Sequence, residues 1–258
     1  WYFYSYIASI SYRVYLKFMS IKINYKSSSQ VKNSSNLILF SDENYNISSL
    51  KKHFSGKEYS FIEDLLKTRN IKKKIQSFDI NSKKKIILVS VRKNLKSSEV
   101  ENLGAKFYDQ FKDSKQNEYY LNSDTASGHL KNFVGYFLHG LKLKSYSFEK
   151  YKTKKNIKKI SINVIGKNKP NELNQLKFKS IEEGTFYARD LVSEPGNILH
   201  PDEYSKRINS LRKFGLKVKI YDEKQLKKLG MNTLLGVGQG SIRGSYLVTM
   251  EWNGLKDK

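Results

Sequence analysis

A chain of 258 residues is long enough for one large domain or for two of ordinary size. Hydrophobic residues make up 38% of the chain and aromatic residues 13%, so it can build a core and does not have the composition of a disordered protein. Because the chain has no cysteine, a disulfide scaffold, a thiol nucleophile and a thiolate metal site are all excluded.

The net charge of +24 is unevenly distributed along the chain. Residues 1–165 contain 31 Lys and Arg against 13 Asp and Glu, a net of +18, whereas residues 166–258 contain 17 against 11, a net of +6. A basic face on the first part would bind nucleic acid by releasing counterions from phosphate. The alternative is compositional, because Lys, Asn, Ile, Tyr and Phe share AT-rich codons and a low-GC genome would produce the same excess.

The first stretch, Trp1–Phe18, is aromatic and apolar but fits neither a signal peptide nor a membrane span. Arg13 and Lys17 follow its apolar run instead of preceding it, and the run is shorter than the ~20 residues that a span requires. It is either an interfacial anchor or upstream sequence translated in frame ahead of a true start at Met19. We expect residues 1–18 to be such a non-native extension, and we expect no membrane partner.

Strands and helices are predicted to alternate through residues 19–166. Short β-rich runs predict strands at Ile21–Tyr25, Asn36–Phe40, Lys74–Ile80, Ile86–Val91, Glu118–Leu121 and Ile160–Ile165. Helical spacing predicts helices at Ser60–Lys67, after a capping-box pair at Ser98 and Glu101, and at Ala126–Leu141 with Leu130, Phe133, Val134, Phe137, Leu138 and Leu141 on one face. This alternation indicates an α/β fold with a substantially parallel sheet, in which Ile86–Val91 is buried on both faces.

A segment rich in Lys, Asn and Pro, Gly166–Asn171, marks the predicted domain boundary. A helix is predicted after it at Gln175–Val192, with Ile181, Ala188, Leu191 and Val192 facing inward, ended by Glu194-Pro195-Gly196. The next predicted elements are a helix at Pro201–Lys213 closed by Gly215, a strand at Leu216–Tyr221, a helix at Glu223–Leu229 stopped by Gly230, and a strand at Ser245–Trp252.

The glycines of Gly236-Val237-Gly238-Gln239-Gly240 suggest a phosphate-binding loop. A dinucleotide fingerprint needs G-x-G-x-x-G spacing and a helix that opens at the loop. Here the spacing is G-x-G-x-G and a strand is expected to follow. The segment is therefore predicted to be a turn in which backbones approach closely.

The other candidate site residues are weaker. His53, His129, His139 and His200 form no H-E-x-x-H pattern, so each is predicted to be a surface or hydrogen-bonded histidine rather than a metal ligand. Asp190 and Glu194 lie four residues apart and could do acid–base work, but ion pairs or helix–loop hydrogen bonds are expected, with Arg189 and lysines nearby. Asp202 stands in the first turn of a helix, where the dipole favours a carboxylate. The runs Lys72–Lys74 and Lys83–Lys85 are predicted to be solvated strand ends that protect an edge.

The stretch Tyr187–Pro201, YARDLVSEPGNILHP, resembles the A-R-D-L-V-N-E-P-x-N-x-L-T-P signature of the leucyl (cytosol) aminopeptidases. Leu235–Ser241 matches the family's L-G-V-G-Q-G-S, and Met250–Gly254 is similar to its L-E-Y-x-G strand end. Ser193 stands for the usual Asn and His200 for the usual Thr, at positions that are not catalytic in the family.

This resemblance implies a macro-domain-like N-terminal α/β domain at residues 19–166, a linker and connecting helix at 167–195, and the incomplete beginning of an α/β metallopeptidase domain at 196–258. It implies removal of N-terminal residues from peptide substrates by two divalent metal ions, manganese or zinc, in a cytoplasmic homohexamer.

The family's metal ligands are a Lys and an Asp in a V-G-K-G-x-T-F-D segment, a further Asp, and an Asp-x-Glu followed by an Arg. All of them lie downstream of the strand that ends here at Trp252. No catalytic, cofactor-binding or metal-binding residue is therefore assigned to this chain, which we expect to be an inactive fragment that binds no metal by itself. The alternative is a non-catalytic role of the basic N-terminal domain in binding nucleic acid or a nucleotide such as ADP-ribose.

Overall fold

The computed structural model describes residues 21–26, 35–68, 73–126, 128, 130–153 and 159–254. The expected extension before Met19 and the candidate His129 lie outside these ranges. The chain forms two compact units that divide between Tyr187 and Ala188, inside one long helix. The domain limits expected from the sequence stay predictions.

The first unit is built on a six-stranded sheet in the order β1-β6-β5-β2-β4-β3. Its strands are β1 (Ile21–Tyr25), β2 (Asn36–Ser41), β3 (Ile75–Asn81), β4 (Lys84–Ser90), β5 (Glu118–Asn122) and β6 (Ile160–Ile165). Neighbouring strands pair in parallel, except for β3 and β4, which form an antiparallel hairpin. The predicted α/β fold with a mostly parallel sheet is confirmed, and each predicted strand of this sheet lies within two residues of an observed one.

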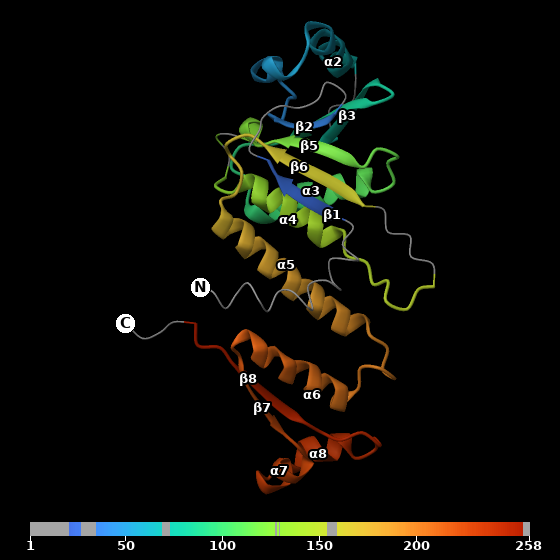
Figure 1. The fold of residues 1–258 in the computed structure, drawn as a ribbon, viewed down its shortest axis with the longest axis vertical. Coiled ribbons are helices and arrows are strands. Elements are labelled where there is room, and N and C mark those ends of the chain that lie inside the picture. The colour runs from blue at the N-terminus through green and yellow to red at the C-terminus, as the bar shows by residue number, and fades with distance from the viewer. Residues whose placement is uncertain are drawn as a thin grey trace. The chain divides into compact units, whose positions relative to one another are not determined.

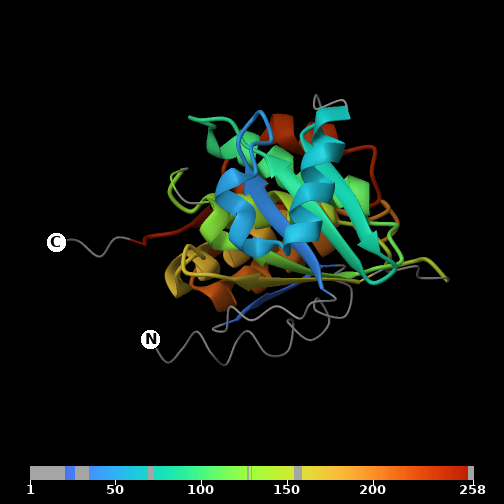
Figure 2. The ribbon, with the colours of Figure 1, turned by 90° about the horizontal axis from the view of Figure 1, so that it is seen from above.

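Helices cover both faces of this sheet, and each face has its own core (Figures 1 and 2). They are η1 (Ser48–His53), α2 (Gly56–Thr68), α3 (Ser97–Phe111), η2 (Ser123–Ala126) and α4 (Phe133–Lys144). Along β2, Leu37 and Leu39 pack with Ile62 of α2, whereas Ile38 and Phe40 pack with residues of α3 and α4. This alternation follows from the two-residue period of a strand, and it explains why the central strands are apolar throughout.

Helices α3 and α4 touch backbone to backbone. A Cβ atom added to Gly104 would lie 1.9 Å from the carbonyl oxygen of Phe137, and one added to Gly140 would lie 1.9 Å from that of Glu101. The Phe137 ring beside this contact makes edge-to-face contacts with Phe40 and Phe107, at centroid distances of 5.3 and 5.9 Å. The two glycines therefore allow an approach that no other residue would permit.

Two predicted helix starts are wrong. Helix α3 begins at Ser97, and the backbone N–H of Lys96 donates to Glu99 Oε2 at 2.9 Å, so the acidic capping residue is Glu99 and not Glu101. Helix α4 begins at Phe133 and not at Ala126, because Asn132 has a left-handed φ of 62° that a helix cannot contain. Leu130, expected on the apolar face, is exposed.

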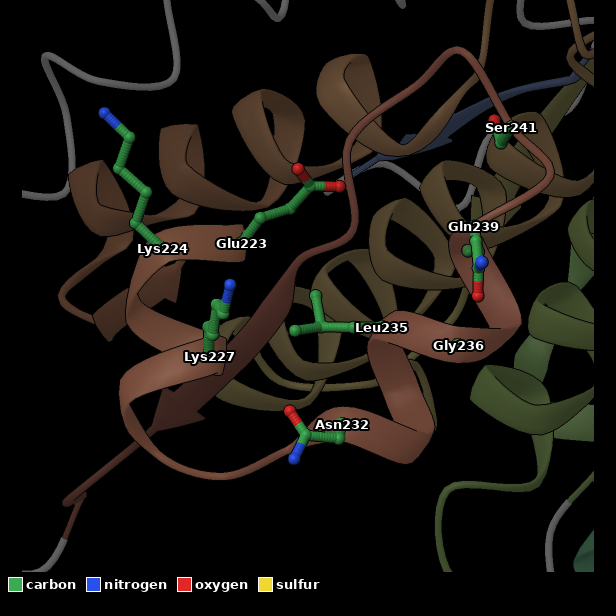
Figure 3. A pocket seen from close by; sticks show the side chains of 9 residues that line it. Glu223, Lys224, Lys227, Asn232, Leu235, Gly236, Gln239 and Ser241 are labelled. Carbon is green, nitrogen blue, oxygen red and sulfur yellow. The ribbon is translucent and has the colours of Figure 1, made fainter.

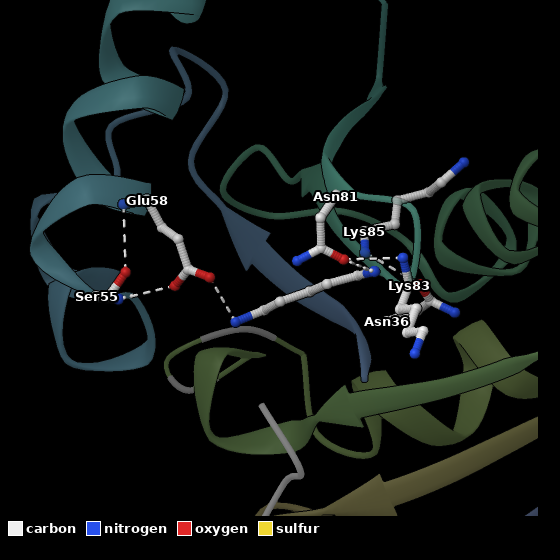
Figure 4. A network of polar contacts seen from close by, with 7 residues as sticks. Asn36, Ser55, Glu58, Asn81, Lys83 and Lys85 are labelled. Carbon is white, nitrogen blue, oxygen red and sulfur yellow. Dashed lines mark hydrogen bonds and ion pairs between the residues drawn. The ribbon is translucent and has the colours of Figure 1, made fainter. Parts of the chain in front are cut away.

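A polar network joins the start of α2 to the amino ends of the central strands (Figure 4). The backbone N–H of Glu58 donates to Ser55 Oγ at 3.3 Å, and that of Ser55 donates to Glu58 Oε2 at 2.9 Å, which makes a capping box. Lys84 Nζ lies 2.6 Å from Glu58 Oε1. Burial raises the pKa of Glu58, but the hydrogen bonds from Lys84 and Ser55 outweigh it, so that the net shift is downward. Asn36 Oδ1 accepts from the backbone N–H of Lys85 at 3.0 Å.

The prediction of solvated lysines is thus wrong for two of them. Lys84 and Lys85 are largely buried, and Lys85 Nζ pairs with Asp79 at 3.1 Å. Lys83, Lys73 and Lys74 are exposed as expected. The aliphatic part of a lysine side chain can be buried while its ammonium group reaches a carboxylate, which explains the difference.

The long helix α5 (Glu172–Ser193) ends just before Glu194-Pro195-Gly196, as predicted. Its predicted inward face is wrong at three of four residues, because Ile181 and Ala188 are exposed and Val192 is 87% exposed, whereas Leu191 is half-buried. The residues that α5 buries are Glu182 and Phe186. The buried face is selected by partners on α4, which the spacing of apolar residues along α5 does not show.

The second unit contains a two-stranded antiparallel sheet and short helices. Its elements are α6 (Pro201–Asn209), η3 (Ser210–Phe214), β7 (Lys217–Tyr221), α7 (Glu223–Lys228), α8 (Asn232–Gly238) and β8 (Leu247–Glu251). Strands β7 and β8 pair from Lys217↔Glu251 to Tyr221↔Leu247. Gly215 and Gly230 end their helices with φ of 92° and 71°, as predicted. None of the helices in the described ranges is long and apolar enough to cross a membrane.

Candidate functional site

The glycine segment lies in a helix rather than in the predicted turn. Helix α8 continues through Gly236 and ends at Gly238, with Gly240 after it. The segment borders an open hollow of about 550 Å³ between α7 and α8 (Figure 3). The hollow is lined by Glu223, Lys224, Lys227, Asn232, Leu235, Gly236, Gly238, Gln239 and Ser241.

The position of these glycines argues against phosphate binding. They stand at the C-terminal end of α8, where carbonyl groups and the negative end of the helix dipole repel an anion. A Cβ on Gly238 would lie 2.0 Å from Ser245 Oγ, whereas one on Gly236 would meet nothing within 4 Å. The backbone approach that the sequence predicted is not found at Gly238, where the close neighbour is a side-chain hydroxyl in the loop that leads into β8.

A second polar group surrounds Asp202, in the first turn of α6 as predicted. Tyr246, just before β8, donates its hydroxyl to Asp202 Oδ1 at 2.7 Å. His200 Nδ1 and Arg243 Nη1 lie 3.1 and 3.9 Å from Asp202 Oδ2. The hydrogen bond from Tyr246 lowers the pKa of Asp202, with His200 adding to the effect, and the same bond raises the pKa of Tyr246. The group joins α6 to the segment that leads into β8.

The carboxylate of Glu194 is engaged in an ion pair, as predicted, with Arg207 as a partner. Glu194 Oε1 accepts from Arg207 Nη1 at 3.1 Å, and Arg207 Nε donates to Glu203 Oε1 at 2.9 Å. These contacts raise the pKa of Arg207, with Glu203 the larger influence. Asp190 is placed one turn before Glu194, whose backbone N–H donates to the Asp190 carbonyl at 3.0 Å.

The histidines lie in separate surroundings. His53 Nδ1 is 3.3 Å from Asn122 Nδ2, and His139 Nδ1 is 3.2 Å from Glu182 Oε1. His200 is in the Asp202 group. Within the described residues, no three His, Asp or Glu side chains are grouped so that they could hold a metal ion. The structure therefore does not bring the candidate residues together into one site.

Sequence reasoning missed the partners in these contacts. Tyr246, Arg207 and Glu182 are separated from their partners by 44, 13 and 43 residues. Contacts over such separations depend on the fold, and no local spacing signals them.

A family match covers almost all of the second unit. Residues 186–258 match the catalytic domain of the Cytosol aminopeptidase family. A probable cytosol aminopeptidase of Brucella anthropi is 43% identical over 128 residues, which are 46% of this chain and 26% of that protein. The resemblance to the cytosol aminopeptidases is confirmed.

Solved structures show a likeness of fold over most of the chain. A mutant of tomato leucine aminopeptidase superposes on 92% of this chain with a TM-score of 0.71 at 17% identity. The bottromycin maturation enzyme BotP in complex with Mn covers 85% with a TM-score of 0.63 at 15% identity. This chain covers 52% and 45% of those two chains, so it spans about half their length.

Proposed function

We propose that this chain is the N-terminal part of a metal-dependent aminopeptidase that removes N-terminal residues from peptides. The observation that carries the proposal is the match of residues 186–258 to the cytosol aminopeptidase catalytic domain. The fold likeness to tomato leucine aminopeptidase over 92% of the chain supports it. The nucleic-acid or nucleotide role is not favoured, because the curated relative in Brucella anthropi is named a probable cytosol aminopeptidase and the tomato structural neighbour a leucine aminopeptidase.

The proposed domain organisation follows the sequence. Residues 19–166 would form a macro-domain-like domain, residues 167–195 the linker and connecting helix, and residues 196–258 the start of the catalytic domain. We further propose a cytoplasmic homohexamer.

Two divalent ions, manganese or zinc, would supply the chemistry by activating water and polarising the scissile carbonyl. BotP, one of the structural neighbours, is named as a complex with Mn. The described residues of this chain do not fit such a centre, because they contain no cluster of His, Asp and Glu side chains. We therefore assign no metal ligand and no catalytic step to them, and we place both in the V-G-K-G-x-T-F-D segment and the acidic residues after it.

The proposal is tested by reading the frame that follows Lys258 and by assaying two proteins. We expect a V-G-K-G-x-T-F-D-like segment to follow. The longer product should hydrolyse leucine amide with added Mn²⁺ or Zn²⁺, lose activity with a chelator and regain it with metal. The 258-residue chain should be inactive under the same conditions.

Two outcomes would contradict the proposal. Metal-dependent hydrolysis by the 258-residue chain would refute the assignment of the chemistry to later residues. A longer product that folds and binds metal but cleaves no peptide would refute the function. Retention of the 258-residue chain on DNA at low salt would support the binding alternative.

A further inference from the structure

Within the first unit, helix α5 contacts α4 through a narrow stripe of side chains. Phe178, Glu182 and Phe186 are spaced by four residues, which places them on one face of α5. The Phe178 ring lies 5.2 Å from the ring of Tyr136, and its Cε2 atom occupies space 2.3 Å from where a Cβ on Gly135 would be. The stripe therefore begins with an aromatic ring seated over a glycine of α4.

Phe178 and Phe186 each contact an aromatic ring on α4 or just past its end. The Phe178 ring lies 5.4 Å from the ring of His139, and the Phe186 ring lies 5.5 Å from that of Tyr146, just past the end of α4. The two phenylalanines thus flank the centre of the stripe on both sides.

The centre of the stripe is a buried carboxylate. The side chain of Glu182 is 4% exposed, and each of its oxygens has a partner on α4. His139 Nδ1 lies 3.2 Å from Oε1, and Lys142 Nζ lies 2.9 Å from Oε2. The Nδ1–H of His139 can donate this hydrogen bond, and the Lys142 ammonium balances the charge of the carboxylate.

Other ionisable groups face the same point. Burial raises the pKa of Tyr25, on β1, to about 12, and the negative charge of Glu182 contributes. Burial also raises the pKa of Glu183, with Lys179 and Lys142 opposing and Glu182 adding to the rise. A protonated Tyr25 carries no charge and does not balance the Glu182 carboxylate. Within the described residues, the lysine that contacts this carboxylate is Lys142.

The core of the first unit does not depend on α5. Both hydrophobic clusters of the sheet are built without any residue of this helix. At the start of α5, Asn174 Nδ2 donates to Asn132 Oδ1 at 3.1 Å, and the Phe178 ring is seated over Gly135. The apolar contacts of Phe186 have no direction, so the second half of the stripe is positioned mainly by the ion pairs of Glu182. A shift by one turn, about 5.4 Å, would separate Glu182 from both partners and leave a carboxylate buried without a cation, which is a costly arrangement.

We propose that Glu182, His139 and Lys142 form an ionic latch that fixes the register of helix α5 on helix α4. The two phenylalanines hold the helix against the first unit, and the latch selects one position along it. This inference stands apart from the proposed function, because the register can be measured in the 258-residue chain whether or not the parent protein is a peptidase.

The first test is hydrogen exchange of the α5 amides in full-chain variants. Lys142→Met leaves Glu182 without its cation and should speed exchange in residues 172–187 by about a hundredfold, with β2 and β4 less affected. The matched control is Lys144→Met on the same helix, because Lys144 pairs with Asp109 at 3.1 Å with both side chains about half exposed. The control should leave exchange unchanged. Equal exchange in the two variants would overturn the latch.

The double variant Glu182→Leu/Lys142→Met, compared with its two single variants, tests whether Glu182 and Lys142 act as a pair. It leaves no buried carboxylate without a cation, so the spin-label distances in this double variant decide the question if Lys142→Met alone unfolds the first unit. Its effect on exchange should be smaller than the sum of the two single effects, because the two side chains act as a pair. Additive effects would show that they do not.

The position of α5 can be read from spin labels, since the chain has no native cysteine. Labels at the exposed sites Lys106→Cys on α3 and Lys177→Cys on α5 should give one narrow distance when the latch is intact. In the Glu182→Leu/Lys142→Met background a second population should appear, displaced along the helix by about one turn, ~5.4 Å. A single unchanged distance in that background would overturn the proposal.

Discussion

The two units of the chain differ in how completely they bury their own apolar residues. In the first, helices cover both faces of the six-stranded sheet, and α4 alone buries Phe133, Val134, Phe137, Leu138 and Leu141. In the described part of the second, the fully buried residues are Ser205, Ile208, Val218 and Leu226. Val237 and Ile242 are 84% and 99% exposed there.

The unit with the more complete core is not the unit that contains most of the family match. The stretch that matches the cytosol aminopeptidase catalytic domain is the one that buries least within itself. Burial of apolar side chains within the second unit therefore does not explain why its sequence matches the family. Polar contacts contribute there instead, through Asp202 with Tyr246 and Glu194 with Arg207.

The largest effect that would sharpen this comparison comes from removing one aromatic ring from each unit. Phe137→Ala removes a fully buried ring and should lower the free energy of unfolding of the first unit by about 3–5 kcal/mol. Phe214→Ala removes a half-exposed ring in the second unit and should change stability by no more than about 0.5 kcal/mol. Urea unfolding followed by circular dichroism measures both. Equal losses would break the comparison.

A smaller effect, of opposite sign in the two units, is expected at helical glycines. Gly140→Ala forces a Cβ into the backbone of α3 and should destabilise the first unit by about 1–3 kcal/mol. Gly236→Ala in α8 meets no atom within 4 Å and should stabilise the second unit by about 0.5–1 kcal/mol, because alanine favours the helix. Thermal unfolding of the two variants measures the difference. Destabilisation by Gly236→Ala would contradict the open space beside this glycine.

The smallest expected effect concerns the polar contacts of the second unit. The hydrogen bond from Tyr246 holds the pKa of Asp202 below its ordinary value, so the bond contributes stability above the unfolded pKa and loses it as pH falls through the folded one. Tyr246→Phe should raise the pKa of Asp202 towards its ordinary value, and carboxyl-carbon NMR titration measures the change. Glu203 serves as the internal control, since its pKa is lowered chiefly by Arg207 and should not move.

The strands of the sheet were predictable from sequence because each is a short apolar run whose burial on two faces leaves a clear pattern, as at Ile86–Val91. The face of α5 was not, because its burial depends on Lys142 and His139, some 40 residues earlier. The start of α4 depends on the left-handed backbone of Asn132, which the apolar spacing conceals. At the candidate site, local expectations such as the first-turn position of Asp202 were confirmed. Its contact with Tyr246 required the fold.

The close approach of α3 and α4 at Gly104 and Gly140 also limits how the first unit can move. Packed helices commonly shift past one another by small sliding motions of their interlocked side chains. At this crossing the main chains themselves are in contact, so rotation or sliding of either helix would drive the carbonyl oxygens of Phe137 and Glu101 into the facing main chain. The pair must move as one rigid body, and conformational freedom in this unit falls to α5, whose attachment is narrow and partly ionic.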